Sequence, residues 1–319
     1  MNVSQVDILE NTIRKHRNLL EVLLIDQTRS TKQKSHNILW ATDSYLGHNP
    51  KDEIQIEDIT GRNTYLIQPR IAKSKEEQKA RTRDKAEVFT PKEIVYEMNQ
   101  QVDWTGEHWP ADEDNWQDYV LENKLEIACG EAPFIVGRYN AANGKKVLKL
   151  SERVGFLDRK LQTVSKFTNT KNTWLEWSSK AFKASYGYEW QGDNLLLARE
   201  NLLYTFIDYW NDKFPEDTIN LDCRVAKDKM DILLEIARII SWNIFQMDGI
   251  KFVVPMSCKH ETIEEELPPM AVLWGEKPEI TKKECYGCKF NDPKRHNGKY
   301  AYIMDWEKNK KIKFVSLLK

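Results

Sequence analysis

Three short apolar segments, each separated from the next by a long helical stretch, constrain the fold of this chain most strongly. The segments cover residues 125–129, 186–190 and 244–245. Between and around them, apolar residues recur at helical spacing over residues 151–183, 195–210 and 228–242. Strands that alternate with helices form mainly parallel sheets, because a parallel connection needs a crossover. The sequence therefore predicts an α/β fold whose sheet carries helical insertions.

The flanking regions have different patterns. Residues 4–30 have the apolar spacing of one amphipathic helix, and Thr90-Pro91 is typical of a helix start over 91–101. The composition changes after Pro255, where an acidic run, a diproline and the cysteines begin. We therefore expect a helical and mixed N-terminal region over 1–85, an α/β domain over 86–255 and a small C-terminal lobe over 256–319.

The charge balance restricts how the protein could meet a polyanion. Lys and Arg number 48 against 49 Asp and Glu, so the whole-molecule field does not attract nucleic acid and any contact must be local. The basic run from Arg70 to Lys85 is such a candidate, although a helix face with paired charges is the favoured interpretation. No apolar run approaches the ~20 residues of a membrane span, and the N-terminus lacks the apolar core of a secretory signal. We therefore expect a cytoplasmic protein that does not associate with a membrane.

Two of the predicted strands end in residues suited to a nucleoside ligand. The first runs into Glu126-Ile127-Ala128-Cys129-Gly130, and the second ends at Gly187-Tyr188-Glu189. In open parallel sheets, ligands lie beyond the carboxyl ends of the strands, where a glycine lets the backbone approach and an acid holds ribose hydroxyls. The order of these residues favours a cofactor site between the two strand ends.

These segments resemble the motifs of the adenine-specific DNA methyltransferases of restriction-modification systems. The first family motif reads D-P-A-C-G-T-G-x-F, and Ala128, Cys129, Gly130 and Phe134 match it, with Glu126 in place of its acid. The resemblance implies a Rossmann-like methyltransferase sheet that binds S-adenosylmethionine, and duplex DNA as the substrate.

Three further segments follow the order of that family. By this resemblance the Phe89-Thr90-Pro91 segment packs on the methionine part of the cofactor, and Asp248 reaches its adenine amino group. Glu189 takes the ribose hydroxyls, with Asp193 as a close rival. The tryptophans, Trp190 among them, are interpreted as packing residues.

The chain departs from the family at the chemical step. Ala132 replaces the usual second glycine, and no [DNS]-P-P-[YF] motif is recognisable, so the catalytic residues are unknown. The nearest diproline is Leu267-Pro268-Pro269-Met270, which offers neither a side-chain acceptor nor a ring. Two hypotheses follow: a DNA adenine-N6 methyltransferase, or a catalytically impaired binding subunit that acts with a restriction or specificity partner.

The cysteines indicate a metal rather than disulfides. There are five, an odd number, and three lie after residue 257. The Cys-x-x-Cys pair and its neighbours supply ligands for one tetrahedral zinc, with free thiols as the alternative. The candidate ligands are Cys258, His260, Cys285, Cys288 and His296.

Overall fold

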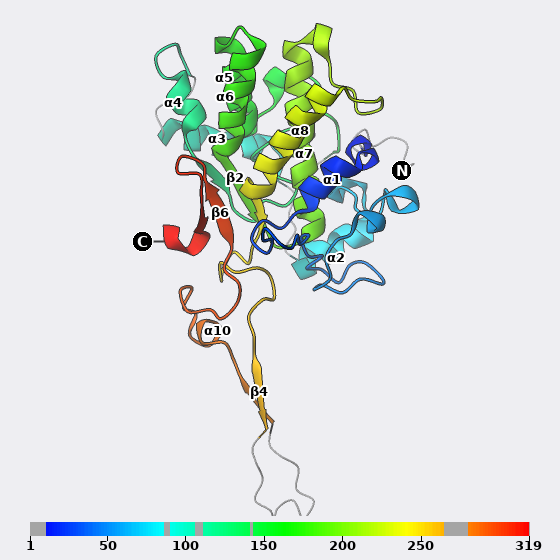
Figure 1. Ribbon diagram of the computed structural model, residues 1–319, viewed down its shortest axis with the longest axis vertical. Coiled ribbons are helices and arrows are strands. Elements are labelled where there is room, and N and C mark those ends of the chain that lie inside the picture. Colours follow the sequence, from blue (N-terminus) through cyan, green and yellow to red (C-terminus); the bar gives the residue numbers. More distant parts are fainter. Residues whose placement is uncertain (1–10, 86–89, 106–110, 141–142, 265–279, 319) are drawn as a thin grey trace, which may run out of the picture.

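A three-stranded parallel sheet forms the centre of the molecule. The computed structural model describes residues 11–85, 90–105, 111–140, 143–264 and 280–318 (Figure 1). The strands are β1 (Lys124–Glu126), β2 (Ser185–Glu189) and β3 (Ile244–Gln246), in the order β1-β2-β3. Leu125 pairs with Tyr186, and Tyr188 pairs with Phe245. The predicted mixed α/β fold with a parallel sheet is confirmed.

Four helices form the two crossovers between these strands. The first crossover contains α5 (Phe156–Phe167) and α6 (Lys171–Lys183), and the second contains α7 (Gly192–Lys213) and α8 (Lys227–Asn243). The helical pattern over 151–183 is thus two helices, because Thr170 adopts an extended backbone and caps α6. Nearly every residue in the first three turns of α7 is buried, since both the sheet and the N-terminal region cover it.

The N-terminal region differs from the single helix expected over 4–30, of which residues 4–10 lie outside the described residues. A short 3-10 turn, η2 (Thr12–Lys15), is followed at His16 by an extended backbone and then by α1 (Arg17–Leu24). The helix ends at Ile25 because that residue forms an antiparallel bridge with Asn37. A tertiary contact therefore stops a helix that the apolar spacing alone would continue.

Arg199 ties this region to the sheet. Its buried guanidinium donates hydrogen bonds to backbone carbonyls of four residues on α1, α8 and β3 or beside them: Leu23, Ile25, Ser241 and Ile244. Burial lowers the pKa of Arg199 to about 10, so the side chain stays charged. Apolar residues before position 85 belong to the same hydrophobic core as α5 to α8. One core thus spans the first two expected regions.

The remaining elements surround this core or leave it. The N-terminal region ends with α2 (Lys75–Lys85), and α3 (Lys92–Thr105) and α4 (Trp116–Leu121) lie between it and β1. The other short 3-10 turns are Ile56–Asp58, Gly61–Asn63, Arg70–Ala72, Leu150–Glu152, Pro215–Asp217 and Phe314–Leu317.

The C-terminal elements form two antiparallel pairs joined by a short helix. The strands β4 (Glu261–Glu264) and β5 (Ile280–Lys283) pair with each other and extend away from the body of the molecule (Figure 1). After α10 (Tyr286–Phe290), β6 (Tyr302–Asp305) returns to contact α8 and pairs with β7 (Lys310–Lys313). No helix in the described residues is both long and apolar enough to cross a membrane.

Candidate functional site

A cavity of about 1070 Å³ opens beyond the carboxyl ends of the three parallel strands. Its walls come from the loop after β1, from the residues that end β2 and from the turn after β3. The residues expected to bind a cofactor that line it are Thr90, Glu126, Ala128, Cys129, Gly130, Glu189 and Asp248. Segments up to 158 positions apart in the sequence, Thr90 and Asp248, therefore meet at one cavity.

The loop after β1 bends sharply at the cavity. Ala128, Gly130 and Ala132 all have left-handed backbones, with φ of 47°, 53° and 65°. Only glycine adopts this region without strain, so both alanines are held there by their surroundings. The Cys129 amide donates to the Tyr188 carbonyl at 2.8 Å, which extends the pairing of β1 with β2. A methyl group built on Gly130 would meet no atom within 4 Å and would project into open space.

Glu189 is fixed at the end of β2 by the backbone. Its Oε2 accepts the Gly130 amide at 2.9 Å, and its Oε1 accepts the Gln191 amide at 3.0 Å. The Glu189 carbonyl in turn accepts the Met247 amide at 3.0 Å. Glu189 thus joins the three strand ends, because its carboxylate binds the loop after β1 and its backbone carbonyl binds the residue after β3.

Glu126, like Glu189 and Asp248, is a buried acid in the cavity wall. Its Oε2 accepts the Ile135 amide at 3.1 Å. Burial, and then the nearby charge of Glu189, hold the pKa of Glu126 well above its usual value, although the Phe134 and Ile135 amides oppose this. Five acidic side chains line the cavity against three basic ones: Asp84, Glu126, Glu131, Glu189 and Asp248 against Arg70, Arg83 and Lys251. The balance favours a ligand with positive charge.

Asp248 closes the opposite wall. Its Oδ1 accepts the amides of Ile250 and Lys251, both at 3.0 Å, and its own amide donates to the Val253 carbonyl at 2.8 Å. A tight turn directly after β3 thus holds the side chain beside Met247, which also lines the cavity.

Asp193, the rival of Glu189, does not line the cavity. Its fully buried carboxylate accepts hydrogen bonds from the Tyr45 hydroxyl at 2.8 Å and from Arg81 at 2.7 Å. Burial raises its pKa, but the charges of Lys73 and Arg81 outweigh this and lower it. The side chain anchors the N-terminal region to the start of α7. Pro91 is not among the lining residues, and Phe89 lies outside the described residues.

Trp190 departs from its interpretation as a packing residue. Its indole donates to the Ala41 carbonyl at 2.9 Å, yet the side chain is 36% exposed and lines the cavity next to Glu189. Sequence reasoning also missed Tyr139 and Asn201, which contact Glu131 at the cavity wall. The position of Trp190 directly after a strand-end acid was the signal available for it.

The basic run from Arg70 to Lys85 is largely committed to internal contacts. Arg81 binds Asp193, Arg70 donates to the Gln78 carbonyl and to Thr82, and Arg83 pairs with Asp84. These contacts agree with the interpretation as a helix face with paired charges.

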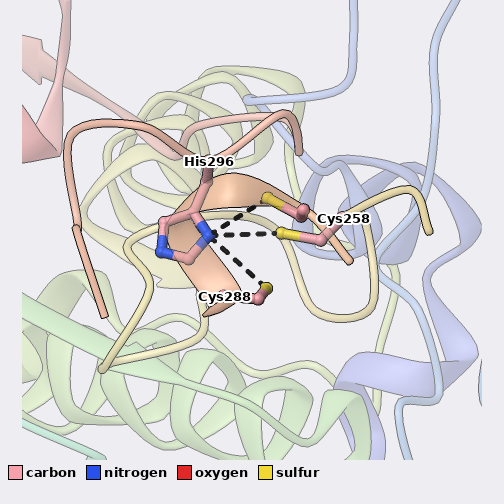
Figure 2. Close-up of side chains that lie close together, drawn as sticks. Cys258, Cys288 and His296 are labelled. Atoms are coloured by element: carbon pink, nitrogen blue, oxygen red, sulfur yellow. Dashed lines mark hydrogen bonds between the residues drawn. The ribbon is translucent and has the colours of Figure 1, made fainter. Parts of the chain in front are cut away.

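A second constellation lies at the base of the C-terminal pair β4 and β5. Among the described residues, Cys258, Cys285, Cys288 and His296 place their ligand atoms within 4.8 Å of one another. Nδ1 of His296 lies 3.5, 3.7 and 3.6 Å from the sulfur atoms of Cys258, Cys285 and Cys288. Figure 2 shows the imidazole facing the sulfur atoms of the labelled cysteines. The group could hold a metal ion such as zinc.

The surroundings of this cluster favour thiolate at Cys285. Burial opposes ionisation, but amides of Asn297 and Cys288 and the His296 ring lower the pKa of Cys285 to about 6. The Asn297 amide donates to the Cys285 sulfur at 3.2 Å. Gly287 allows His296 to approach, because a methyl group on it would lie 2.7 Å from Nδ1.

His260, the fifth predicted ligand, is not part of the cluster. It is exposed, and its Nδ1 accepts the Cys285 amide at 3.4 Å. Cys223 is exposed elsewhere, and Cys129 is a buried part of the cavity wall.

No known protein family matches the chain, and comparison with curated proteins and with solved structures found no match either. The functional interpretation therefore rests on the geometry described above and on the motifs that led to it.

Proposed function

We propose that this cavity binds S-adenosylmethionine and that the chain is a DNA adenine-N6 methyltransferase-like protein with a Rossmann-like sheet. One observation carries the proposal: the four segments selected by their motif order line a single cavity beyond the strand ends. Three of the segments follow neighbouring parallel strands, whose carboxyl ends lie at one edge of the sheet, and Thr90 joins them from outside the sheet. Ligand sites of open parallel sheets lie at this edge.

The cavity fits such a cofactor in size and charge. Ligand cavities span roughly 300–1,000 Å³, so about 1070 Å³ leaves room for a nucleoside cofactor and part of a second substrate. S-adenosylmethionine carries a sulfonium and an ammonium group, which suit a wall with an excess of carboxylates. In this proposal Glu189 binds the ribose hydroxyls, Asp248 the adenine amino group, and the exposed face of Trp190 packs on the adenine ring.

The lack of recognisable catalytic residues favours a protein that needs a partner for methyl transfer. The diproline at 268–269 lies outside the described residues. Asp305-Trp306 is the other place where the sequence sets an acid beside a ring, but both side chains are engaged elsewhere. Trp306 donates to Asn243 at 2.8 Å, and Asp305 pairs with Lys308. We therefore keep, as the second form of the proposal, a binding subunit that needs a restriction or specificity subunit to methylate duplex DNA.

Calorimetric titration with S-adenosylmethionine tests the cofactor. Gly130→Ala places a methyl group in the cavity. Glu189→Gln removes a charged acceptor, and a hydrogen bond to a charged group contributes roughly 1.5–3 kcal/mol. Each change should weaken binding about tenfold or more. Gly61→Ala is the matched control, because Gly61 has a φ of 61° and open space around it but does not line the cavity. Unchanged affinity in both cavity variants would refute the site.

Transfer of tritiated methyl groups to genomic DNA distinguishes the two forms of the proposal. The isolated chain is compared with the chain supplemented with cell extract that contains its partner subunits. Activity only after supplementation identifies a subunit that needs a partner. Strong activity of the isolated chain identifies a self-sufficient methyltransferase, and no activity in either arm rejects methyl transfer.

For the cysteine cluster we propose one structural zinc. At about 2.3 Å to sulfur and about 2.05 Å to nitrogen, a tetrahedral zinc sets each sulfur about 3.6 Å from the nitrogen. The distances of 3.5, 3.6 and 3.7 Å match this geometry. Elemental analysis should find one zinc per chain, lost in His296→Ala and Cys288→Ser but kept in the controls His260→Ala and Cys223→Ser. Zinc-free protein purified without chelator would contradict the assignment.

A further inference from the structure

The residues around the metal cluster form a surface rich in basic and aromatic side chains. Between positions 283 and 300 there are five basic residues and two acidic ones, in a chain whose net charge is -1. Basic and aromatic residues alternate with the metal ligands themselves. We call six exposed residues the knuckle surface, five from α10 and the segment after it and one from the loop that carries Cys258: Tyr286, Lys289, Phe290, Lys294, Arg295 and Lys259.

Two aromatic rings of the knuckle surface face solvent. Tyr286 is 49% exposed and Phe290 is 58% exposed, and their ring centres lie 4.6 Å apart on the same turn of α10. The Arg295 guanidinium lies 5.1 Å from the Tyr286 ring centre, and the Lys289 ammonium lies 5.4 Å from that of Phe290. Exposed large rings lose the hydrophobic gain of burial, so a pair of them beside cations marks a contact surface.

The positions of these side chains are set by the cluster beneath them. Cys285 and Cys288 bracket the first turn of α10, and His296 directly follows Arg295. The Gly287 amide donates to the Arg295 carbonyl at 3.0 Å, which joins the two halves of the surface. A bound metal would therefore hold rings and cations in a fixed arrangement, so little ordering entropy is lost when a partner binds.

We propose that the knuckle surface binds DNA, and that it prefers a single strand or an unpaired stretch over intact duplex. Phosphates bind Lys289, Lys294 and Arg295, while an unstacked base packs on the exposed rings of Tyr286 and Phe290. An acidic protein surface would match the cations but offers no flat face for the rings. The inference deepens the proposed function by naming a DNA contact outside the cofactor cavity, and it uses the proposed zinc only as the support of the segment.

Fluorescence anisotropy with a short fluorescein-labelled single-stranded DNA tests the surface in the full chain. Lys289→Gln and Lys294→Gln should each weaken binding and reduce the slope of log affinity against log salt by about 0.7. Phe290→Ala should weaken binding about tenfold with little change in that slope. Lys227→Gln, at the exposed first residue of α8, is the matched control and should leave both quantities unchanged.

The zinc content and S-adenosylmethionine affinity of each variant separate local from global effects. Variants that match the wild type in both properties but lose DNA affinity support the surface. If the wild type binds no S-adenosylmethionine, the proposed function fails, and unchanged zinc content alone then serves as the control for the surface. The proposal is overturned if the zinc-loaded wild type binds no DNA, if the Lys289→Gln and Phe290→Ala variants bind as tightly as the wild type, if intact duplex is preferred, or if RNA of the same sequence binds more tightly.

Discussion

At the scale of residues, burial changes the pKa of two ionisable side chains in the cavity wall. Glu126 and Cys129 are both buried, and burial raises the pKa of each well above its ordinary value. Burial therefore favours the protonated form of Glu126 in the empty cavity. A cationic ligand changes this, because its charge stabilises the ionised form of a neighbouring carboxyl group.

Glu126 should couple ligand binding to proton release. The free protein has a raised pKa at Glu126, and a bound sulfonium lowers it, so binding expels a proton and affinity rises with pH until the free-protein pKa is passed. Glu126→Gln keeps an acceptor for the Ile135 amide but removes the titration. Calorimetry of S-adenosylmethionine binding in buffers of different ionisation enthalpy measures the effect. Equal proton release by the wild type and Glu126→Gln would show that another group is responsible.

At the scale of elements, the cap of α6 is a local determinant of the first crossover. The Thr170 hydroxyl accepts the Thr173 amide at 3.2 Å, and the Thr170 amide donates to the Thr173 hydroxyl at 3.3 Å. The helix buries Trp174 and Phe182 in the core. Thr170→Ala should lower the free energy of unfolding by about 1 kcal/mol, measured by urea denaturation. Thr170→Ser keeps the hydroxyl and should lose much less; equal losses in both would assign the effect to packing.

The elements also show what the sequence could predict. The three strand positions and α7 and α8 follow from apolar spacing, because local pattern and tertiary burial agree there. The end of α1 does not, since the bridge from Ile25 to Asn37 is made by residues outside the pattern. Glu189 lines the cavity and Asp193 does not, because Tyr45 and Arg81, more than 100 positions earlier, bind the Asp193 carboxylate.

For the metal cluster, too, the sequence could predict one part and not another. Ligand types and the Cys-x-x-Cys spacing indicated the site, because thiolate and imidazole are the groups that zinc prefers. The selection of His296 over His260 depended on which ring faces the sulfur atoms, and spacing carries no information about that. Likewise, the sequence contained Trp190 beside Glu189 but could not show that its partly exposed side chain lines the cavity.

For the whole molecule, we expect Arg199 to make the N-terminal region and the sheet unfold as one cooperative unit. Arg199→Lys should lower the free energy of unfolding by about 3 kcal/mol, because an ammonium has fewer donors for the four carbonyls and loses its proton more readily when buried. Hydrogen exchange should show α1 and α8 losing protection together. Arg224→Lys, at an exposed position, is the control; loss of protection in α1 alone would mean that the two parts unfold independently.

The placement of the cysteines gives the protein a built-in chemical reporter. Cys223 is exposed, Cys129 is a buried part of the cavity wall with a raised pKa, and the other three belong to the cluster. An alkylating reagent should therefore modify Cys223 alone while zinc is held, and add the three cluster thiols once a chelator removes it. Cys129 should react only when the chain unfolds. Intact mass spectrometry would then read the state of the metal centre and of the core from one sample, without a label or a ligand.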